Sequence, residues 1–411
     1  LIVAKACEDL DFPGVSVSDY TLRKIHQVRG QIPLVAYPLV LIGVIREMRD
    51  QLVYSLFEDD IFGWWRDGFT GFMQKSSSEL LRESVDKRLE DFSEAVAKVI
   101  FMLYKFDFRE VAGDPLGDLY QKYFDKDTRK ALGEFYTPVE VVDYILDAVG
   151  YENIGSNRLL DPACGSGTFI VEALKRYLRE ATGKAKKHGW ASVLRELCNS
   201  PRIVGFDIHP FACLIARTRF MLELIPYFKK ALEEEAPRIF YVQRIPVFRT
   251  DSLAIETLPP EFRRQHELAE TKEDIVFPVE LPMKINSEKS ISVSIILPSW
   301  GKIVSHEMLL YNLDEYFCTL QAIFDAVKKL IEVGAELIPE RSLKAYLQEY
   351  LTDKDFERLA NFFKPYADHI LGEIKRIQSE YEDGRLIKSI EDTVLAALLK
   401  NYLHYDFVVG N

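Results

Sequence analysis

The sequence predicts an α/β protein in which a parallel sheet is combined with two mainly helical regions. Between about residues 133 and 253, short apolar runs ending in Asp or Gly alternate with helical patterns, which is typical of βαβ units. Residues 1–132 instead space their apolar side chains by three and four, with charges between them, as helices do. The same helical periodicity dominates most of residues 254–404.

These changes of pattern divide the chain into four segments. We expect an N-terminal helical domain over residues 1–132, an α/β core over 133–253, an inserted, mainly helical subdomain over 254–404, and a fourth core strand over 405–411. Within the insertion, DIVFPVEL and ISVSIIL are typical of the two strands of a β-hairpin. A structureless loop of roughly 150 residues is implausible in a compact protein, so a folded subdomain is the better interpretation.

Composition is that of an ordinary globular protein, with 48% hydrophobic and 28% charged residues. The net charge of −12 argues against a uniformly basic protein that coats nucleic acid, although it allows local basic faces. Five widely spaced cysteines without a CxxC pair argue against a disulfide framework or a zinc site and favour a reducing cytoplasm. The longest apolar run, residues 33–45, is too short to span a bilayer. Because the chain begins with Leu1 rather than Met, we expect a segment of a longer protein.

The stretch LLDPACGSGTF, residues 159–169, predicts a strand that ends in an acid, Asp161, followed by a loop of small residues and a helix. Gly165 and Gly167 would let a ligand approach the backbone. The loop lacks the third glycine of a dinucleotide fingerprint and the lysine of a P-loop, so we do not expect it to hold a pyrophosphate or a triphosphate. Asp161 is better suited to a cationic group. The alternative is an ordinary tight turn between a strand and a helix.

Two further strands are predicted to end in acids. Asp207 follows the apolar run IVGF, where its carboxylate could accept hydrogen bonds from the hydroxyls of a ribose, while Ile208 could pack on an adenine. Alternatively, this turn simply starts a helix at Pro210. Asp251 follows VFRT, and its carboxylate could accept a hydrogen bond from an exocyclic amine. Alternatively, Asp251 and Ser252 form an ordinary turn, in which an Asp-Ser pair is common.

An upstream motif, GEFYTPVE, precedes the first predicted core helix. Thr137 and Glu140 fit a capping box with Pro138 at the first helical position. Phe135 and Tyr136 stand before that helix start, whose free backbone amides could clasp a carboxylate. Together with three acids on three successive strand tips, this motif indicates a nucleoside pocket at the carboxyl edge of a parallel sheet.

In this order, the motifs resemble the DNA adenine-N6 methyltransferases of restriction-modification and related phage-defence systems. GEFYTP, DPACGSGTF, GFDIHP and TDSL resemble the cofactor motifs of that family, and the final YDFVVGN resembles the entry to its catalytic tetrapeptide, Asn-Pro-Pro-Tyr or Phe. The resemblance covers about residues 115–253 and 405–411. It implies a Rossmann-like class I methyltransferase sheet, cut after its fourth strand because the rest of the tetrapeptide and the target-recognition domain are not in the chain. We therefore do not expect the segment to methylate by itself.

The resemblance also implies a cofactor, S-adenosyl-L-methionine, and a catalytic residue, Asn411, that accepts a hydrogen bond from the amine of a flipped base. The cofactor-binding residues that it implies are Phe135, Tyr136, Thr137, Pro138, Asp161, Ala163, Gly165, Gly167, Thr168, Phe169, Asp207, Ile208, Asp251 and Ser252. The implied partners are double-stranded DNA and a nuclease domain in the same chain or a separate restriction or specificity subunit, with no membrane association.

Other functions remain open at this point. Asn411 favours adenine over cytosine, because the cytosine-N4 group usually begins its tetrapeptide with Ser. Methyltransferases that act on a glutamine side chain or on ribosomal RNA share the Asn-Pro-Pro motif, but they lack the upstream GEFYTP element and a long helical region. A different class is a non-catalytic subunit that binds the cofactor and DNA within a defence complex.

Overall fold

The computed structural model describes the chain over residues 2–11, 41, 87–103, 105–109, 116, 137–151, 157–234, 245–252, 272–282, 290–306, 309–332, 334, 336–380 and 385–411. Phe135, Tyr136 and most of the predicted N-terminal helical domain therefore lie outside the described residues. The chain divides into two compact units. The first comprises Leu1–Tyr136, Ser166–Arg195 and Leu214–Ile245, and the second comprises Thr137–Gly165, Glu196–Cys213 and Pro246–Asn411.

A four-stranded parallel sheet forms the centre of the second unit, in the order β3-β2-β1-β6. Its strands are β1 (Leu159–Asp161), β2 (Ile203–Asp207), β3 (Val247–Arg249) and β6 (Phe407–Val408). Leu159 pairs with Ile203 on one side and with Phe407 on the other, so the last strand of the chain lies beside the first. The prediction of a helix-rich α/β fold with a parallel sheet is thus confirmed. Because all four strands are parallel, their carboxyl ends lie at the same edge of the sheet.

Helix α9 (Val139–Ala148) precedes β1 and belongs to the same unit. It ends in a Schellman motif, in which Gly150 has a φ of 73° and the Tyr151 amide donates to the Leu146 carbonyl at 2.9 Å. Tyr151 is buried and packs edge-on against Phe407 of β6, with ring centroids 5.2 Å apart. The end of α9 is therefore fastened to the start of β6.

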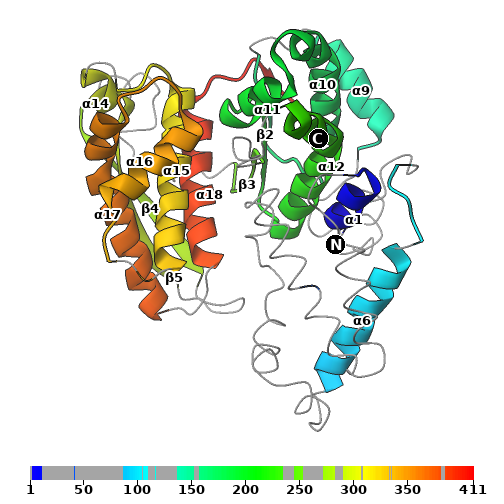
Figure 1. Ribbon diagram of the computed structural model, residues 1–411, viewed down its shortest axis with the longest axis horizontal. Coiled ribbons are helices and arrows are strands. Elements are labelled where there is room, and N and C mark those ends of the chain that lie inside the picture. Colours follow the sequence, from blue (N-terminus) through cyan, green and yellow to red (C-terminus); the bar gives the residue numbers. More distant parts are fainter. Residues whose placement is uncertain are drawn as a thin grey trace. The chain divides into compact units, whose positions relative to one another are not determined.

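Among the described residues, the second unit also contains a β-hairpin and the helices α14 to α18 (Figure 1). Strands β4 (Asp274–Pro282) and β5 (Ser290–Pro298) pair antiparallel, and they are followed by α14 (Trp300–Ser305), α15 (Leu313–Glu332), α16 (Glu340–Tyr350), α17 (Phe356–Glu380) and α18 (Arg385–Tyr402). One hydrophobic core joins these elements to β2 and β3. Within it, Phe317 of α15 packs edge-on against Phe248 of β3, at 6.2 Å between ring centroids.

Polar contacts also bind this helical region to the sheet. The Arg158 guanidinium, next to β1, donates to both carboxylate oxygens of Asp314 at 2.6 and 2.7 Å. The Ser200 hydroxyl, just before β2, donates to the same carboxylate at 2.8 Å.

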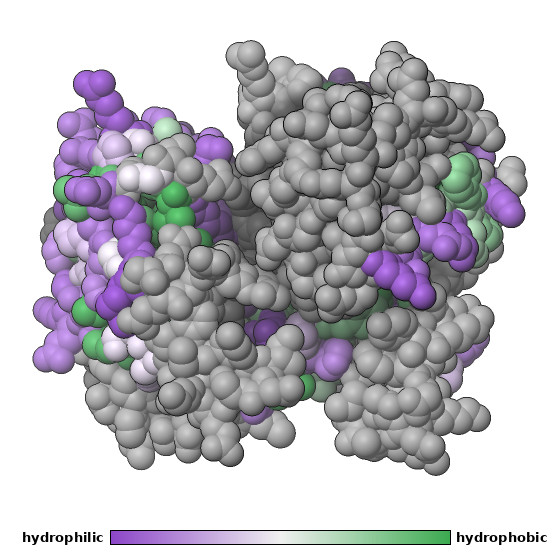
Figure 2. Space-filling model, turned by 90° about the horizontal axis from the view of Figure 1, so that it is seen from below, coloured by the Kyte–Doolittle hydropathy of each residue, from purple (hydrophilic) through white to green (hydrophobic). Residues whose placement is uncertain are grey.

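Where the helices face outward, their surface is mostly hydrophilic with small, separate hydrophobic patches (Figure 2). The described residues of this helical region thus share a hydrophobic core with the strands of the sheet.

The first unit contains α1 (Ile2–Asp9), α6 (Lys87–Leu103), α10 (Thr168–His188) and most of α12 (Pro210–Glu234), together with the start of α11 (Trp190–Asn199). The Glu234 carboxylate at the end of α12 accepts the Trp190 amide at 2.6 Å and so caps α11. The Lys229 ammonium donates to the Leu10 carbonyl at 3.1 Å, which links α12 to the end of α1. Among the described residues, no helix is both long and apolar enough to cross a membrane.

Candidate functional site

The loop after β1 is hydrogen-bonded to the tip of β2. The Gly165 amide donates to the Asp207 carboxylate at 2.8 Å, and the Cys164 amide donates to the Phe206 carbonyl at 2.8 Å. Gly165 has a φ of 53°, and a Cβ added to it would meet no atom within 4 Å. The glycine is therefore needed for the left-handed backbone, and the space in front of it is open.

Asp161 ends β1 as a buried carboxyl group, 1% exposed. It accepts a hydrogen bond from the Ala163 amide at 3.1 Å. The pKa of Asp161 is raised to about 7, mainly because the carboxyl is buried; the Ala163 amide acts in the opposite direction, and the nearby Asp207 carboxylate adds a smaller increase. No lysine, arginine or histidine of the described ranges forms an ion pair with it. A buried carboxyl without a cation is a group that a positively charged ligand would stabilise in its ionised form.

The tip of β2 separates the two interpretations of GFDIHP. His209 occupies the cap position, since its carbonyl accepts the Cys213 amide at 3.1 Å, and Pro210 is the first residue of α12. Asp207 is not the helix cap. One of its carboxylate oxygens accepts the His209 amide at 2.7 Å, and the other accepts Gly165. Ile208 beside it is 67% exposed, so a large apolar side chain stands in solvent next to an acid that retains free lone pairs.

The third predicted acid lies just beyond β3. The Thr250 amide donates to the Asp207 carbonyl at 2.9 Å, which extends the pairing of β2 and β3 to the edge of the sheet. Asp251 follows as an exposed side chain and Ser252 is half-buried. Asp251 interacts electrostatically with Lys400 of α18, whose pKa is lowered mainly by burial. Asp251 and Ser252 thus follow β3 at the same edge of the sheet as the ends of β1 and β2.

The end of the chain reaches the same edge through β6. The Val409 amide donates to the Leu160 carbonyl at 2.9 Å, and Gly410 lies so close to Asp161 that an added Cβ would be 3.3 Å from its carboxylate oxygen. The Asn411 amide nitrogen then donates to the Thr137 hydroxyl at 3.0 Å. The structure thus brings the candidate catalytic Asn together with a residue of the upstream motif.

The predicted capping box is wrong in its geometry. Helix α9 begins at Val139, so Pro138 and not Thr137 takes the cap position, where it makes no side-chain capping hydrogen bond. The helix start is stabilised only by its backbone, because the Val141 and Val142 amides reach the Pro138 carbonyl at 3.0 and 3.1 Å. The Thr137 hydroxyl is used instead for the contact with Asn411.

The second half of the glycine-rich loop belongs to the first unit. Gly167 has a φ of 85°, and a Cβ there would lie 2.8 Å from the Ala216 Cβ, so only glycine allows α10 and α12 to approach this closely. Thr168 and Phe169 are buried. The buried Arg219 guanidinium donates to the Ser166 carbonyl at 2.6 Å. Sequence reasoning missed Arg219, because an arginine in mid-helix carries no signal of a distant partner.

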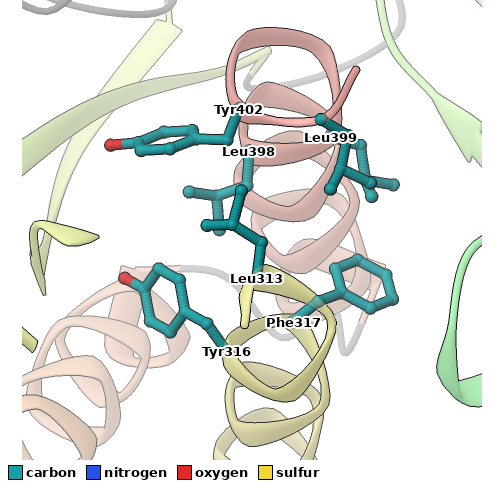
Figure 3. Close-up of a pocket in the computed structure, with 7 residues that line it drawn as sticks. Leu313, Tyr316, Phe317, Leu398, Leu399 and Tyr402 are labelled. Carbon is teal, nitrogen blue, oxygen red and sulfur yellow. The ribbon is translucent and has the colours of Figure 1, made fainter. Parts of the chain in front are cut away.

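An apolar pocket elsewhere in the second unit has a different character. It lies between α15 and α18 and is lined by Leu313, Tyr316, Phe317, Leu398, Leu399, Tyr402 and Leu403. In Figure 3, the two tyrosines extend to one side, and Phe317 and Leu399 to the other. The lining has no charged side chain, so we regard the pocket as a gap in helix packing. Within the described ranges, no group of three or more His, Cys, Asp or Glu side chains could hold a metal ion.

The glycine-rich loop lies in a part of the chain that matches a known protein family. The sequence model of the N-6 DNA Methylase family matches residues 111–233, a range that includes the upstream motif, the loop and the tip of β2. Residues 111–233 match the N-6 DNA methylase family. The match ends before Asp251 and Asn411, which lie just beyond β3 and β6, and these strands pair with β2 and β1 of the matched segment.

Several curated proteins are similar to parts of the chain. The methylase subunit of the type I restriction enzyme MjaVII from Methanocaldococcus jannaschii is 38% identical over 97 residues, which are 23% of this chain and 16% of that protein. The adenine-specific methyltransferase PglX from Streptomyces coelicolor is 35% identical over 115 residues, 26% of this chain and 9% of PglX. The chain thus spans less than a fifth of the length of either relative.

A solved structure of the type IIL restriction-modification enzyme MmeI in complex with DNA is also similar. It is 17% identical, the match covers 62% of this chain and 40% of that chain, and the TM-score is 0.27.

Proposed function

We propose that the chain is the cofactor-binding part of a site-specific DNA methyltransferase that methylates adenine at N6 in a restriction-modification or related defence system. The observation that carries the proposal is the meeting of Asp161, Asp207 and Asn411 at one edge of a parallel sheet. Gly165 ties the first loop to Asp207, and Gly410 lies against Asp161. We assign residues 133–253 and 405–411 to the methyltransferase core and residues 254–404 to an insertion within it.

The order of the strands supports a Rossmann-like arrangement. Numbered along the chain within this sheet, the order β3-β2-β1-β6 is 3-2-1-4, the order found in doubly wound folds. In such sheets, ligands bind outside the carboxyl ends of the strands, near the point where the strand order reverses. Here that point lies between β1 and β6, next to Asp161 and Gly410.

The residues at this edge fit S-adenosyl-L-methionine. The open space at Gly165 allows a ligand to reach the backbone, and the buried Asp161 carboxyl suits a cation. Asp207 has lone pairs for ribose hydroxyls, the exposed Ile208 offers an apolar surface for an adenine, and Asp251 is exposed at the next strand tip. When bound, this cofactor supplies a methyl group on a sulfonium. We propose that Pro138, Ala163 and Ser252 complete the binding site.

Asn411 is suited to act on the target base. Its side-chain oxygen can accept a hydrogen bond from an exocyclic amine, which raises the electron density on that nitrogen. The base must leave the duplex to reach a site at the edge of the sheet, so we propose base flipping. Double-stranded DNA is the proposed partner, and the methylase subunit of a type I enzyme among the relatives favours a separate restriction or specificity subunit. The free cysteines of the described residues accord with a cytoplasmic location.

The second candidate is a non-catalytic subunit that binds cofactor and DNA. The two candidates differ in whether the protein transfers a methyl group to DNA, and an intact Asn-Pro-Pro-aromatic tetrapeptide that begins at Asn411 favours the enzyme. In the complete encoded protein, we expect Asn411→Ala to retain binding of S-adenosylmethionine and to lose transfer of labelled methyl groups to DNA adenine. Asn401→Ala, which removes the same side chain from α18, serves as the control. Full methylation by Asn411→Ala would refute the catalytic assignment, and an unmodified protein that binds cofactor without methylating any DNA would favour the second candidate.

A further inference from the structure

We propose that Thr137 is a positioning residue that holds the Asn411 side chain ready for methyl transfer. The proposal rests on the proposed function and reassigns Thr137 from the cofactor to the target base. Its basis is the hydrogen bond from the Asn411 amide nitrogen to the Thr137 hydroxyl, 3.0 Å long, between residues 274 positions apart. No other hydrogen-bond partner for the Asn411 side chain is present among the residues that the structure describes.

Thr137 lies just before α9, which is held along one face and at its C-terminal end. Val142 and Leu146 bury one face of the helix completely. Gly150 closes its last turn in the left-handed conformation, and Tyr151 is held against Phe407 of β6. A movement of α9 along β6 would therefore break the contact between Tyr151 and Phe407, which limits displacement of the Thr137 hydroxyl.

The Asn411 end is rigid up to its backbone. The Asp406 carboxylate accepts the Arg158 amide at 2.8 Å, and the amides of Asp406 and Phe407 both reach the Arg158 carbonyl at 3.0 Å. After the strand, Gly410 packs against Asp161. What remains free is the rotation of the Asn411 side chain, which is exposed to water. The Thr137 hydroxyl removes that freedom.

The two ends of the Asn411 amide differ chemically, so the orientation of the side chain decides which end faces the base. An Asn side chain has two N–H donors at one end and one carbonyl oxygen at the other. When an N–H group is engaged by Thr137, the oxygen remains to accept from the exocyclic amine of a base. A side chain oriented before the substrate arrives loses less entropy in the transition state, and misplacement by about 1 Å can cost roughly a hundredfold in rate.

The test compares Thr137→Val, which replaces the hydroxyl by a methyl group of similar shape, with Thr137→Ser, which restores the hydroxyl. In the complete encoded protein, we expect Thr137→Val to lower kcat for DNA methylation roughly ten- to a hundredfold. The Kd for S-adenosylmethionine, measured by calorimetry, should stay within about twofold, because the lost contact serves Asn411. Thr137→Ser should recover most of the kcat. If the valine variant does not fold, Thr137→Ala removes the same hydroxyl without adding a branched methyl group.

The outcomes separate this inference from the proposed function. An unchanged kcat in Thr137→Val, alongside loss of activity in Asn411→Ala, overturns only the role of Thr137. A Kd that rises by the same factor as kcat/KM falls also overturns it, since Thr137 would then act on the cofactor. Full activity in Asn411→Ala refutes the proposed function itself.

Discussion

The Gly165 amide donates a hydrogen bond to the Asp207 carboxylate across 2.8 Å, and this bond joins the glycine-rich loop after β1 to the tip of β2. The second oxygen of the same carboxylate accepts the His209 amide at the start of α12. One side chain therefore sets the positions of two loops at the proposed cofactor site.

Replacing Asp207 should therefore weaken cofactor binding through two effects. Asp207→Ala removes the proposed ribose acceptor and leaves the Gly165 and His209 amides without their partner. We expect the Kd for S-adenosylmethionine to rise tenfold or more, which corresponds to about 1.4 kcal/mol. Calorimetric titration measures it. Glu357→Ala, which removes an exposed acid from α17, is the matched control and should bind normally. Equal affinities in the two variants would show that Asp207 only shapes the turn.

The charge state of Asp161 should make cofactor affinity depend on pH. Burial raises the pKa of this carboxyl to about 7, so the free protein holds it mostly protonated at pH 6 and mostly ionised at pH 8. A cationic ligand binds the ionised form more strongly. We therefore expect the affinity for S-adenosylmethionine to rise by up to about tenfold from pH 6 to pH 8, in step with the ionised fraction.

Asp161→Asn tests the source of that dependence. The amide has almost the same shape but cannot ionise, so its affinity should be nearly constant over the same pH range and close to that of the unmodified protein at low pH. Titrations of both proteins at several pH values make the comparison. A slope that survives in Asp161→Asn would assign the pH dependence to another group.

The parts of the site that could be predicted are those with local signals. An acid after an apolar run marks Asp161 and Asp207 as strand tips, and a glycine between small residues marks Gly165 as a close approach, because both features follow from the backbone nearby. The capping box at Thr137 was also a local inference, and it failed because the hydroxyl that should have capped α9 has a partner at the far end of the chain.

The contacts that could not be predicted depend on spatial order. The sequence predicts a fourth core strand at residues 405–411, but the pattern of YDFVVGN does not specify β1 as its neighbour, from which the insertion separates it in sequence. Only this pairing places Gly410 against Asp161. In the same way, the packing of Phe317 on Phe248, which gives the insertion and the sheet a common core, results from long-range shape complementarity that periodicity does not encode.

Gly410 should tolerate a methyl group poorly despite its exposed position. A Cβ there would be 3.3 Å from the Asp161 carboxylate oxygen and 3.7 Å from the Pro162 ring, so Asp161 must move by a few tenths of an ångström. We expect Gly410→Ala to weaken S-adenosylmethionine binding roughly threefold to tenfold, by analogy with other small displacements of positioned groups.

Gly372→Ala is its control, because an added Cβ at this exposed position in α17 meets no atom within 4 Å. It should bind normally and should raise the free energy of unfolding by about 0.5–1 kcal/mol, since alanine favours the helix. Urea denaturation measures the stability and calorimetry the binding. Unchanged binding by Gly410→Ala would mean that the cofactor does not depend on the position of Asp161.

The ion pair between Lys328 of α15 and Glu391 of α18 should be the most sensitive polar contact of the helical region. The ammonium lies 2.7 Å from the carboxylate, and the two side chains are 8% and 0% exposed. Lys328→Met leaves the glutamate charge buried without its cation, and we expect the free energy of unfolding to fall by about 3–5 kcal/mol. Adding Glu391→Leu to that variant removes the uncompensated charge and should recover most of the loss.

The exposed pair of Lys98 and Glu94 on α6 provides the comparison. Its atoms are 2.6 Å apart, but the side chains are 69% and 53% exposed, so solvent already screens the charges. Lys98→Met should lower the free energy of unfolding, measured by urea denaturation, by no more than about 0.5 kcal/mol. If both single substitutions had equally small effects, the buried pair would not hold α15 to α18. If the double variant were as unstable as Lys328→Met alone, loss of packing rather than a stranded charge would explain the instability.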